Sequence, residues 1–291
     1  MQSTLFTLPI TEQLSPFCSL RHQGELTLLI IEHPEFRAAF SLQGGQLIAW
    51  QPLNQSAVIW LSDRTEFTQG KAIRGGVPIC WPWFGPASKP SHGFARISQW
   101  QLGQCEESAQ QVKVAMTLRD SAETRAVWPH PFNLSLIAEL SAESCQLSLK
   151  IEGDFESTAA LHSYFSVGNS ETVSVSGLGD SYIDKVKDNA LGSQQGEQTY
   201  HGEVDRIFTQ PAVESILKDP QLKRAIKIRH QGHSDVVTWN PGKVLSQSMS
   251  DMDDEGYKTM VCVETARIGQ PFITTRTTPA ELTVTITPLP L

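Results

Sequence analysis

Residues 132–140 read FNLSLIAEL, and this stretch indicates how the chain is expected to fold. Apolar side chains occupy every second position, at Phe132, Leu134, Leu136, Ala138 and Leu140. Because successive side chains of a β-strand point to opposite faces, a period of two places one row against a core and leaves the other row in water. Strands with one wet face are typical of antiparallel sheets.

The same kind of pattern continues on both sides of this stretch. Period-two alternation recurs at residues 112–118, 147–151 and 282–286. Short apolar β segments are also expected at residues 25–31, 36–42, 46–52 and 57–62. Adjacent glycines at positions 44 and 45 indicate a tight turn within this first group.

Helical signals are few and short. They occur at residues 121–127 and 211–218, each bounded by proline. Helices of this kind connect strands, so the sequence predicts an all-β protein, a large antiparallel β-sandwich with a few short helices. The chain, 1–291, is expected to form a single domain because no linker interrupts it and all-β sandwiches often exceed about 200 residues.

Composition and charge exclude several classes of partner. The formal net charge is -8 and no basic surface helix is evident, so no nucleic acid is expected to bind. No stretch reaches the roughly 20 apolar residues that a membrane span requires. The N-terminal residues lack a basic region followed by an uninterrupted apolar run, so no signal peptide is expected.

The cysteines predict the compartment. The chain has 5, widely scattered and never spaced as CxxC, so no disulfide framework is expected. Hydrophobic residues make up 40% of the chain, enough to form a core that should fold without such cross-links. A reducing cytoplasm is the simplest location.

The most unusual charge pattern lies in residues 71–100, called the basic segment below. Residues 67–105 contain no Asp or Glu, although the chain as a whole is acidic. Four cations fall within the basic segment: Lys71, Arg74, Lys89 and Arg96. It is therefore a local positive region.

The glycines and prolines of the basic segment predict a stiff, irregular loop. Two glycines follow Arg74 directly, and four prolines exclude a long helix. Because Arg binds phosphate or carboxylate through a planar fork, the loop suits a small, anionic, partly apolar ligand. Equally, Trp81, Trp83 and Phe84 could fill one end of the sandwich while the cations are solvated.

Common cofactor and metal signatures are absent from the sequence. It has no GxxxxGK[ST] loop, no GxGxxG motif after a strand and no HExxH motif. The histidines are too scattered to argue for a metal site. No cofactor and no metal ion are therefore expected.

Two polar residues interrupt apolar strands. His162 lies in TAALHSYFSVG, and Glu264 ends the apolar run of residues 260–263. Burial of a carboxylate is costly without a partner, so the surroundings of Glu264 should raise its pKa or supply hydrogen bonds. Such tuning produces a general base, although a structural salt bridge at Glu264 and a hydrogen-bonded core histidine at His162 are bland alternatives.

Six short motifs follow one another along nearly the whole chain. They are RGGVP at 74–78, HGFAR at 92–96, LHSYF at 161–165, DRIF at 205–208, WNP at 239–241 and VCVE at 261–264. In this order they resemble the hexose-6-phosphate mutarotase branch of the aldose 1-epimerase family. The resemblance implies a galactose-mutarotase-like β-sandwich that interconverts the α and β anomers of a hexose 6-phosphate, glucose 6-phosphate first.

The resemblance also implies roles for particular residues. The catalytic pair would be His162 as acid and Glu264 as base. The substrate-binding set would be Arg74, His92, Arg96 and Asp205. One acid and one base suffice for anomer exchange, with His162 expected to be protonated near its ordinary pKa.

Two other classes of function stay open on the sequence. One is an aldose 1-epimerase for unphosphorylated sugars, in which the cations of the basic segment would have no phosphate to bind. The other is a binding or sensing module without catalysis. A monomer is expected because no apolar surface stripe is evident. Arg206 is interpreted as a structural partner of Asp205. Arg267 is left unassigned.

Overall fold

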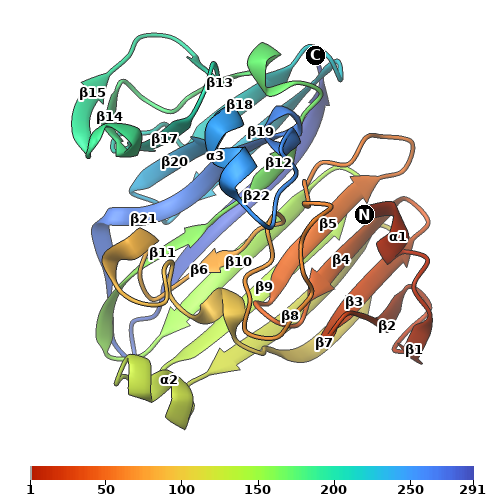
Figure 1. The fold of residues 1–291 in the computed structure, drawn as a ribbon. Coiled ribbons are helices and arrows are strands. Elements are labelled where there is room, and N and C mark those ends of the chain that lie inside the picture. The colour runs from red at the N-terminus through yellow and green to blue at the C-terminus, as the bar shows by residue number, and fades with distance from the viewer. Residues whose placement is uncertain (1) are drawn as a thin grey trace.

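The computed structural model describes residues 2–291, with side chains from residue 4 onward. Three antiparallel sheets form two layers (Figure 1). The larger layer is one nine-stranded sheet whose strands, in spatial order, are β16 (Gln198–Thr199), β13 (Ser174–Ser176), β18 (Glu214–Asp219), β19 (Arg224–Gln231), β22 (Ala280–Pro290), β10 (Cys145–Glu152), β9 (Asn133–Ser141), β8 (Gln111–Arg119) and β7 (Gln101–Glu107).

Two sheets lie side by side in the second layer. The five-stranded sheet contains β1 (Ile10–Gln13), β2 (Cys18–Gln23), β3 (Leu26–His33), β4 (Phe36–Ser41) and β5 (Gln46–Pro52). The eight-stranded sheet contains β15 (Ala190–Ser193), β14 (Ser181–Asp184), β17 (Val204–Phe208), β20 (Asp235–Asn240), β21 (Met260–Thr274), β11 (Phe155–Leu161) and β6 (Ile79–Cys80), with β12 (Tyr164–Ser166) pairing separately to β21.

One large apolar core lies between the two layers. Leu136 of the nine-stranded sheet, Phe40 of the five-stranded sheet and Val263 of the eight-stranded sheet all belong to it, and none is more than 2% exposed. Burying each such side chain contributes about 1.5–3 kcal/mol relative to leaving it exposed. The alternation at residues 132–140 thus supplies an inner face of the sandwich, and the predicted fold class is confirmed.

Helices are short connectors, as expected. The structure has α1 (Gln2–Leu5), α2 (Ala122–Val127), α3 (Gly242–Ser248) and the 3₁₀ turns η1 (Gly85–Ala87), η2 (Ala95–Ile97), η3 (Ser170–Thr172), η4 (Lys185–Lys187) and η5 (Gly256–Thr259). The helix predicted at 121–127 is confirmed, with Ser121 as its N-cap. Within the described residues, no helix is long and apolar enough to cross a bilayer.

Two local predictions were wrong. No helix forms at residues 211–218: residues 214–218 belong to strand β18, because the backbone there pairs with β13 on one side and β19 on the other. Residues 57–62 make only isolated bridges, from Ile59 to Phe165 and from Leu61 to Gly75. These bridges connect this segment to residues far away in the sequence, so its apolar composition reflects burial rather than a strand in a ladder.

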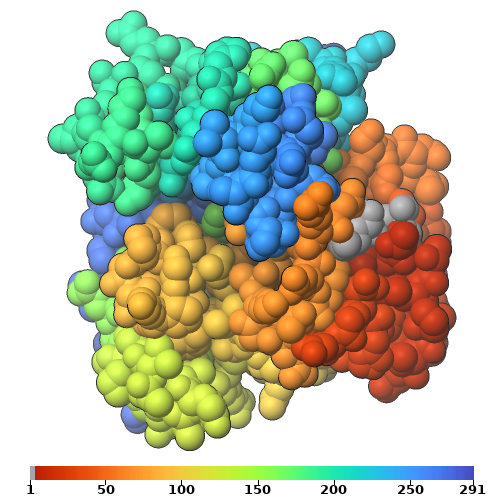
Figure 2. Space-filling view, in the orientation of Figure 1, coloured from red at the N-terminus to blue at the C-terminus, as the bar shows by residue number. Residues whose placement is uncertain are grey.

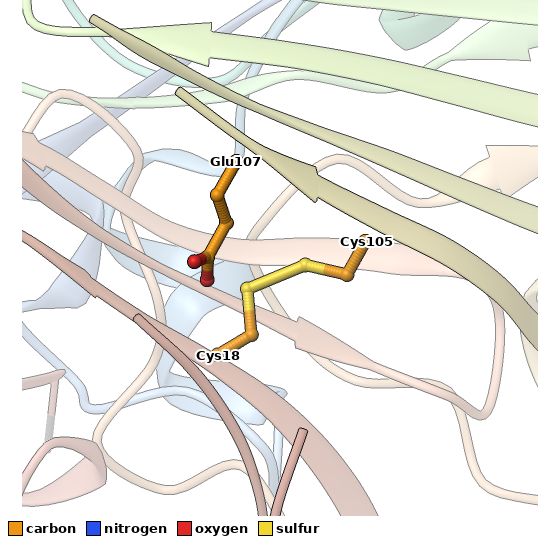
Figure 3. A group of neighbouring side chains, drawn as sticks. All are labelled: Cys18, Cys105 and Glu107. Carbon is orange, nitrogen blue, oxygen red and sulfur yellow. A yellow bond between two sulfur atoms is a disulfide. The ribbon is translucent and has the colours of Figure 1, made fainter. Parts of the chain in front are cut away.

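The prediction that no cysteines pair was also wrong. Cys18 on β2 and Cys105 on β7 form a disulfide, with Glu107 beside them (Figure 3). The carboxylate of Glu107 accepts a hydrogen bond from the Phe17 amide at 2.9 Å. The bridge joins strands from different layers, so sequence spacing offered no sign of it. Cys80, Cys145 and Cys262 are free and buried.

Candidate active site

The site lies on the face of the eight-stranded sheet that points away from the sandwich core. Asp205 pairs with Trp239, Trp239 with Cys262 and Cys262 with Tyr164, which makes one lateral row across four strands. Directly paired residues share a face of a sheet, and residues two positions apart on one strand do so as well. Glu264 therefore projects from the same face as this row.

A cavity of about 190 Å³ opens over this row. Its ionisable lining consists of Arg74, His92, His162, Lys185, Asp205 and Glu264. Aromatic walls come from Phe84, Tyr164 and Trp239. In Figure 2 the gold part of the basic segment, the teal region around residue 190 and the blue region around residue 250 meet on one face of the molecule.

The centre of the cavity is a close pair of His162 and Glu264. His162 Nε2 lies 3.2 Å from Glu264 Oε1, and both side chains are buried. His162 Nδ1 and Glu264 Oε2 have no hydrogen-bond partner among the described residues. The pair thus has two buried polar atoms whose hydrogen bonds the described residues do not supply.

Burial shifts the two pKa values in opposite directions. It raises the pKa of Glu264 well above its usual range, and Asp205 adds to the rise while Arg96 opposes it. It lowers the pKa of His162 well below its usual range, with His92 and two arginines adding to the fall. The expectation that His162 is protonated near its ordinary pKa was therefore wrong, because a buried imidazole loses much of the solvation that stabilises its charge.

Arg74 occupies one end of the cavity. Its Nη1 donates to Tyr164 Oη at 3.1 Å, and its Nε donates to Asp251 Oδ2 at 3.1 Å. The Tyr164 ring is in turn stacked on His162 at 4.8 Å between centroids. Arg74 is thereby held on the His162 side of the pair, with a carboxylate from the acidic loop 248–256 balancing part of its charge.

Close packing explains why glycines follow Arg74. Gly76 has a φ of +70°, and a Cβ there would lie 2.3 Å from the Leu47 carbonyl oxygen. A side chain at this position would push the segment off β5, on which Leu47 lies. The RGG motif is thus required for the close approach that positions Arg74.

His92 also lines the cavity, next to His162. The two rings are 5.8 Å apart, and His92 Nδ1 accepts a hydrogen bond from the Gly85 amide at 3.3 Å. Burial, together with nearby Arg96 and Arg74, lowers the pKa of His92 to about 3. His92 is accordingly a neutral group that can donate from its free nitrogen.

Asp205 lines the cavity from β17, at the end of the lateral row away from Tyr164, and Lys185 lies near it. Burial raises the pKa of Asp205 to about 6, although Lys185 opposes the rise. No hydrogen bond from its side chain appears among the described contacts. Its oxygens can therefore accept from the hydroxyl groups of a ligand.

Arg96 is the one predicted site residue that does not line the cavity. Its Nη2 donates to the Ser91 carbonyl at 2.9 Å, and its Nε is buried without a partner in the described part of the chain. It nevertheless lies close enough to His92 and Glu264 to influence the pKa of each. Arg96 therefore acts on the site through its charge without lining the cavity.

Several other candidates lie outside the site. Trp81 is fully buried in the core, and Lys71 pairs with Glu66 at the surface. Arg206 does not pair with Asp205, because neighbours on a strand face opposite ways; it lies 3.6 Å from Asp184 instead. Arg267 packs over the Phe272 ring and does not line the cavity.

Sequence reasoning missed three contributors. Tyr164 could have been found, since it is two residues from His162 in the LHSYF motif. Lys185 and Asp251 gave no signal, because each lies in a loop that only the folded chain brings to the cavity.

A metal ion could also be held at the base of the cavity. His162, Cys262 and Glu264 are buried and offer ligand atoms within 4.8 Å of one another. Nitrogen, sulfur and oxygen donors of this kind suit zinc. A metal bound there would occupy both members of the central pair.

Comparison with known proteins identifies the family. The family model for aldose 1-epimerase matches residues 27–278. The chain belongs to the aldose 1-epimerase family. Its similarity to one curated member is high: it is 47% identical over 292 residues, 98% of each chain, to "Putative glucose-6-phosphate 1-epimerase" from Escherichia coli K12.

Solved structures agree with the fold. A crystal structure described as "a putative mutarotase" from Salmonella typhimurium superposes with a TM-score of 0.98 at 44% identity, covering 100% of both chains. A galactose 1-epimerase from Lactobacillus acidophilus has a TM-score of 0.70 at 13% identity, covering 93% of this chain and 97% of that one. The galactose-mutarotase-like sandwich implied by the sequence motifs is thus confirmed.

Proposed function

We propose that the protein interconverts the α and β anomers of hexose 6-phosphates, with glucose 6-phosphate as the first substrate to test. The observation that carries the proposal is the buried pair of His162 and Glu264, 3.2 Å apart, at the base of a cavity with Arg74 at one end. Relatives named as glucose-6-phosphate 1-epimerases support the substrate class.

The chemistry needs one base and one acid. Glu264 removes the proton from the C1 hydroxyl while His162 delivers a proton to the ring oxygen, and the C1–O5 bond breaks. The open-chain aldehyde rotates about C1–C2, after which the reverse transfers close the ring on the other face. The pair carries one mobile proton before and after the reaction, so it returns to its starting state.

The opposite pKa shifts bear on where the shared proton lies. A raised carboxylate pKa and a lowered imidazole pKa both favour the uncharged pair, in which Glu264 holds the proton. That proton must move to His162, 3.2 Å away, before His162 can protonate the ring oxygen. The titration belongs to the pair rather than to either residue.

The atoms of the sugar orient it in the cavity. The ring oxygen is bonded to C5, which carries the C6 phosphate, so the phosphate extends from the side of the ring that faces the acid. His162 has Tyr164, Arg74 and His92 on that side. Arg74 is therefore the proposed phosphate contact, and Asp205 the proposed contact for hydroxyl groups, with Arg96 supporting the charge of the site without lining the cavity.

A direct test measures anomer exchange by NMR with glucose 6-phosphate and with glucose, after subtraction of the uncatalysed rate. The wild-type protein should accelerate exchange of the phosphorylated sugar, and Glu264→Gln should slow it by about a hundredfold or more. Glu156→Gln, an exposed substitution on β11, is the matched control and should retain the wild-type rate.

Three outcomes would contradict parts of this proposal. Wild-type exchange rates in Glu264→Gln would remove the base assignment. Faster exchange of glucose than of glucose 6-phosphate would favour an aldose 1-epimerase for free sugars. Tight binding of glucose 6-phosphate without any acceleration would favour a binding or sensing module.

The proposal extends to the setting in which the protein works. A hexose phosphate carries charge that an apolar bilayer excludes, so the enzyme should work in the cytoplasm, where such a substrate is retained. We propose that it works as a monomer, because the sequence shows no apolar surface stripe for a partner subunit. A molecular mass near 32.2 kDa by light scattering is the expected result.

A further inference from the structure

We propose that Lys185 is a specificity-determining residue that binds, together with Asp205, the C2 and C3 hydroxyl groups of the sugar. The inference rests on the proposed anomer exchange and names a contact at the end of the cavity opposite Arg74. It comes from the position of Lys185, from the absence of a close salt bridge to it within the described residues and from the order of atoms in the sugar.

The position of Lys185 follows from the turn that carries it. Asp184 ends β14 and caps the turn η4 by accepting from the Val186 amide at 3.1 Å. The turn packs against β17, the strand that bears Asp205. Lys185 is half-buried and lines the cavity, whereas Lys187, two residues later in the same turn, is exposed and does not.

The charge of Lys185 is not neutralised by an ion pair. Its Nζ donates to Asn189 Oδ1, a neutral oxygen, at 2.6 Å, and none of the salt bridges found among the described residues includes it. Arg74, by contrast, already pairs with Asp251. An ammonium group has three donors, so Lys185 can keep the Asn189 contact and still donate to a ligand.

The order of atoms in the sugar assigns this end of the cavity to C2 and C3. Glu264 acts at O1 and His162 at O5, and both oxygens are bonded to C1. From C1 the ring continues through O5 toward C5 and the phosphate, and through C2 toward C3. With the phosphate on the side of His162 and Arg74, carbons C2 and C3 lie on the other side, where Asp205 influences Glu264 and Lys185 influences Asp205.

A lysine and a carboxylate together suit a pair of neighbouring hydroxyl groups. Asp205 accepts from the hydroxyl hydrogens, and Lys185 donates to the lone pairs of their oxygens. When one hydroxyl is missing, a half-buried charged group is left without its partner, so such a site discriminates against deoxy sugars. Lys185 would then contribute to recognition of the sugar itself and not of its phosphate.

The test compares Lys185→Met with Lys187→Met, a matched substitution in the same turn. Exchange is measured with glucose 6-phosphate, 2-deoxyglucose 6-phosphate, 3-deoxyglucose 6-phosphate and free glucose. Lys185→Met should lower kcat/KM for glucose 6-phosphate by about tenfold, the usual effect of losing a charged hydrogen bond. The loss should shrink to below about threefold for at least one deoxy sugar, and Lys187→Met should leave all rates unchanged.

The remaining outcomes overturn the inference in distinguishable ways. A tenfold loss that is the same for both deoxy sugars would mean that Lys185 contacts neither hydroxyl. A loss for glucose 6-phosphate without any loss for glucose would assign Lys185 to the phosphate. An unchanged Lys185→Met would exclude the contact while leaving the proposed function intact, whereas a wild-type protein without exchange activity would overturn both.

Discussion

At the scale of single residues, the site places its charges at separate points along the cavity. Arg74 contacts Tyr164, which is stacked on His162, whereas Asp205 and Lys185 line the cavity from β17 and η4. A phosphate at one end and hydroxyl groups at the other would therefore meet different side chains. This separation allows recognition of the phosphate to be changed without touching the acid and base.

Removal of Arg74 tests recognition of the phosphate. Arg74→Ala should raise KM for glucose 6-phosphate by about ten- to a hundredfold, because a charge-assisted hydrogen bond contributes about 1.5–3 kcal/mol. The phosphate does not react, so kcat should change much less than KM. Activity on free glucose should stay comparatively unchanged.

The measurement is kcat/KM for both sugars at low and high salt. Lys71→Ala is the control, since Lys71 pairs with Glu66 at the surface and lies outside the cavity. Added salt should weaken the wild-type preference for the phosphorylated sugar. Equal losses on both sugars in Arg74→Ala would mean that this arginine holds the sugar ring or the shape of the site.

At the scale of elements, β21 carries the base and needs its register to be kept. Its pairing with β11 slips between Ser157 and Ala159, so several residues of β21 have no partner on that strand. Asp235 at the start of β20 fills this gap. Its Oδ2 accepts from the amides of Ile268 at 2.9 Å and Gly269 at 2.8 Å.

Loss of the Asp235 carboxylate should therefore destabilise the sheet. Asp235→Ala is expected to lower the free energy of unfolding by about 1–3 kcal/mol, because partly buried amides lose their acceptor. Asp235→Asn keeps one acceptor oxygen and should cost less. Urea denaturation of the three proteins provides the comparison, and equal midpoints would show that water satisfies both amides equally well.

At the scale of the whole molecule, His230 connects the two layers of the sandwich. It lies on β19 of the nine-stranded sheet, and its ring contacts Ser215 Oγ at 3.1 Å and Thr265 Oγ1 at 2.7 Å, the latter on β21 of the other layer. Burial lowers the pKa of His230 to about 3. The residue is therefore neutral in the folded protein at pH values where an unfolded chain would protonate it.

The sign of the resulting pH dependence follows from linkage. Below the unfolded pKa of about 6.5, only the unfolded state gains a proton at this site, so stability is lost as the pH falls from about 6.5 toward 3. Between pH 7.5 and pH 5, the wild type should lose about 2 kcal/mol more than His230→Gln, which cannot titrate.

Comparing the wild type with His230→Gln cancels the contribution of the other buried groups to the change of stability with pH. Asp205 and Glu264, whose pKa values are raised, change stability in the opposite direction with pH, but they do so equally in both proteins. The free energy of unfolding should be measured in urea at each pH. Parallel curves for the wild type and His230→Gln would contradict the assignment of a buried neutral imidazole.

The sequence by itself determined the class of fold and the central pair of the proposed mechanism. Alternation at residues 132–140 is a local property, because side-chain direction in a strand depends only on position along it, and it correctly predicted β9. His162 and Glu264 were found because each interrupts an apolar run, which a folded chain tolerates only where the polar group has a use or a partner. The order of six motifs added the family.

Tertiary structure decided what depends on residues far apart in the chain. Residues 214–218 became part of strand β18 because β13 and β19 offered backbone partners, which outweighed local proline signals. The Cys18–Cys105 bridge, the pairing of Arg74 with Asp251 and the place of Lys185 beside Asp205 all join separate segments. The lowered pKa of His162 has the same origin, since desolvation by surrounding segments sets it and no stretch of sequence contains that information.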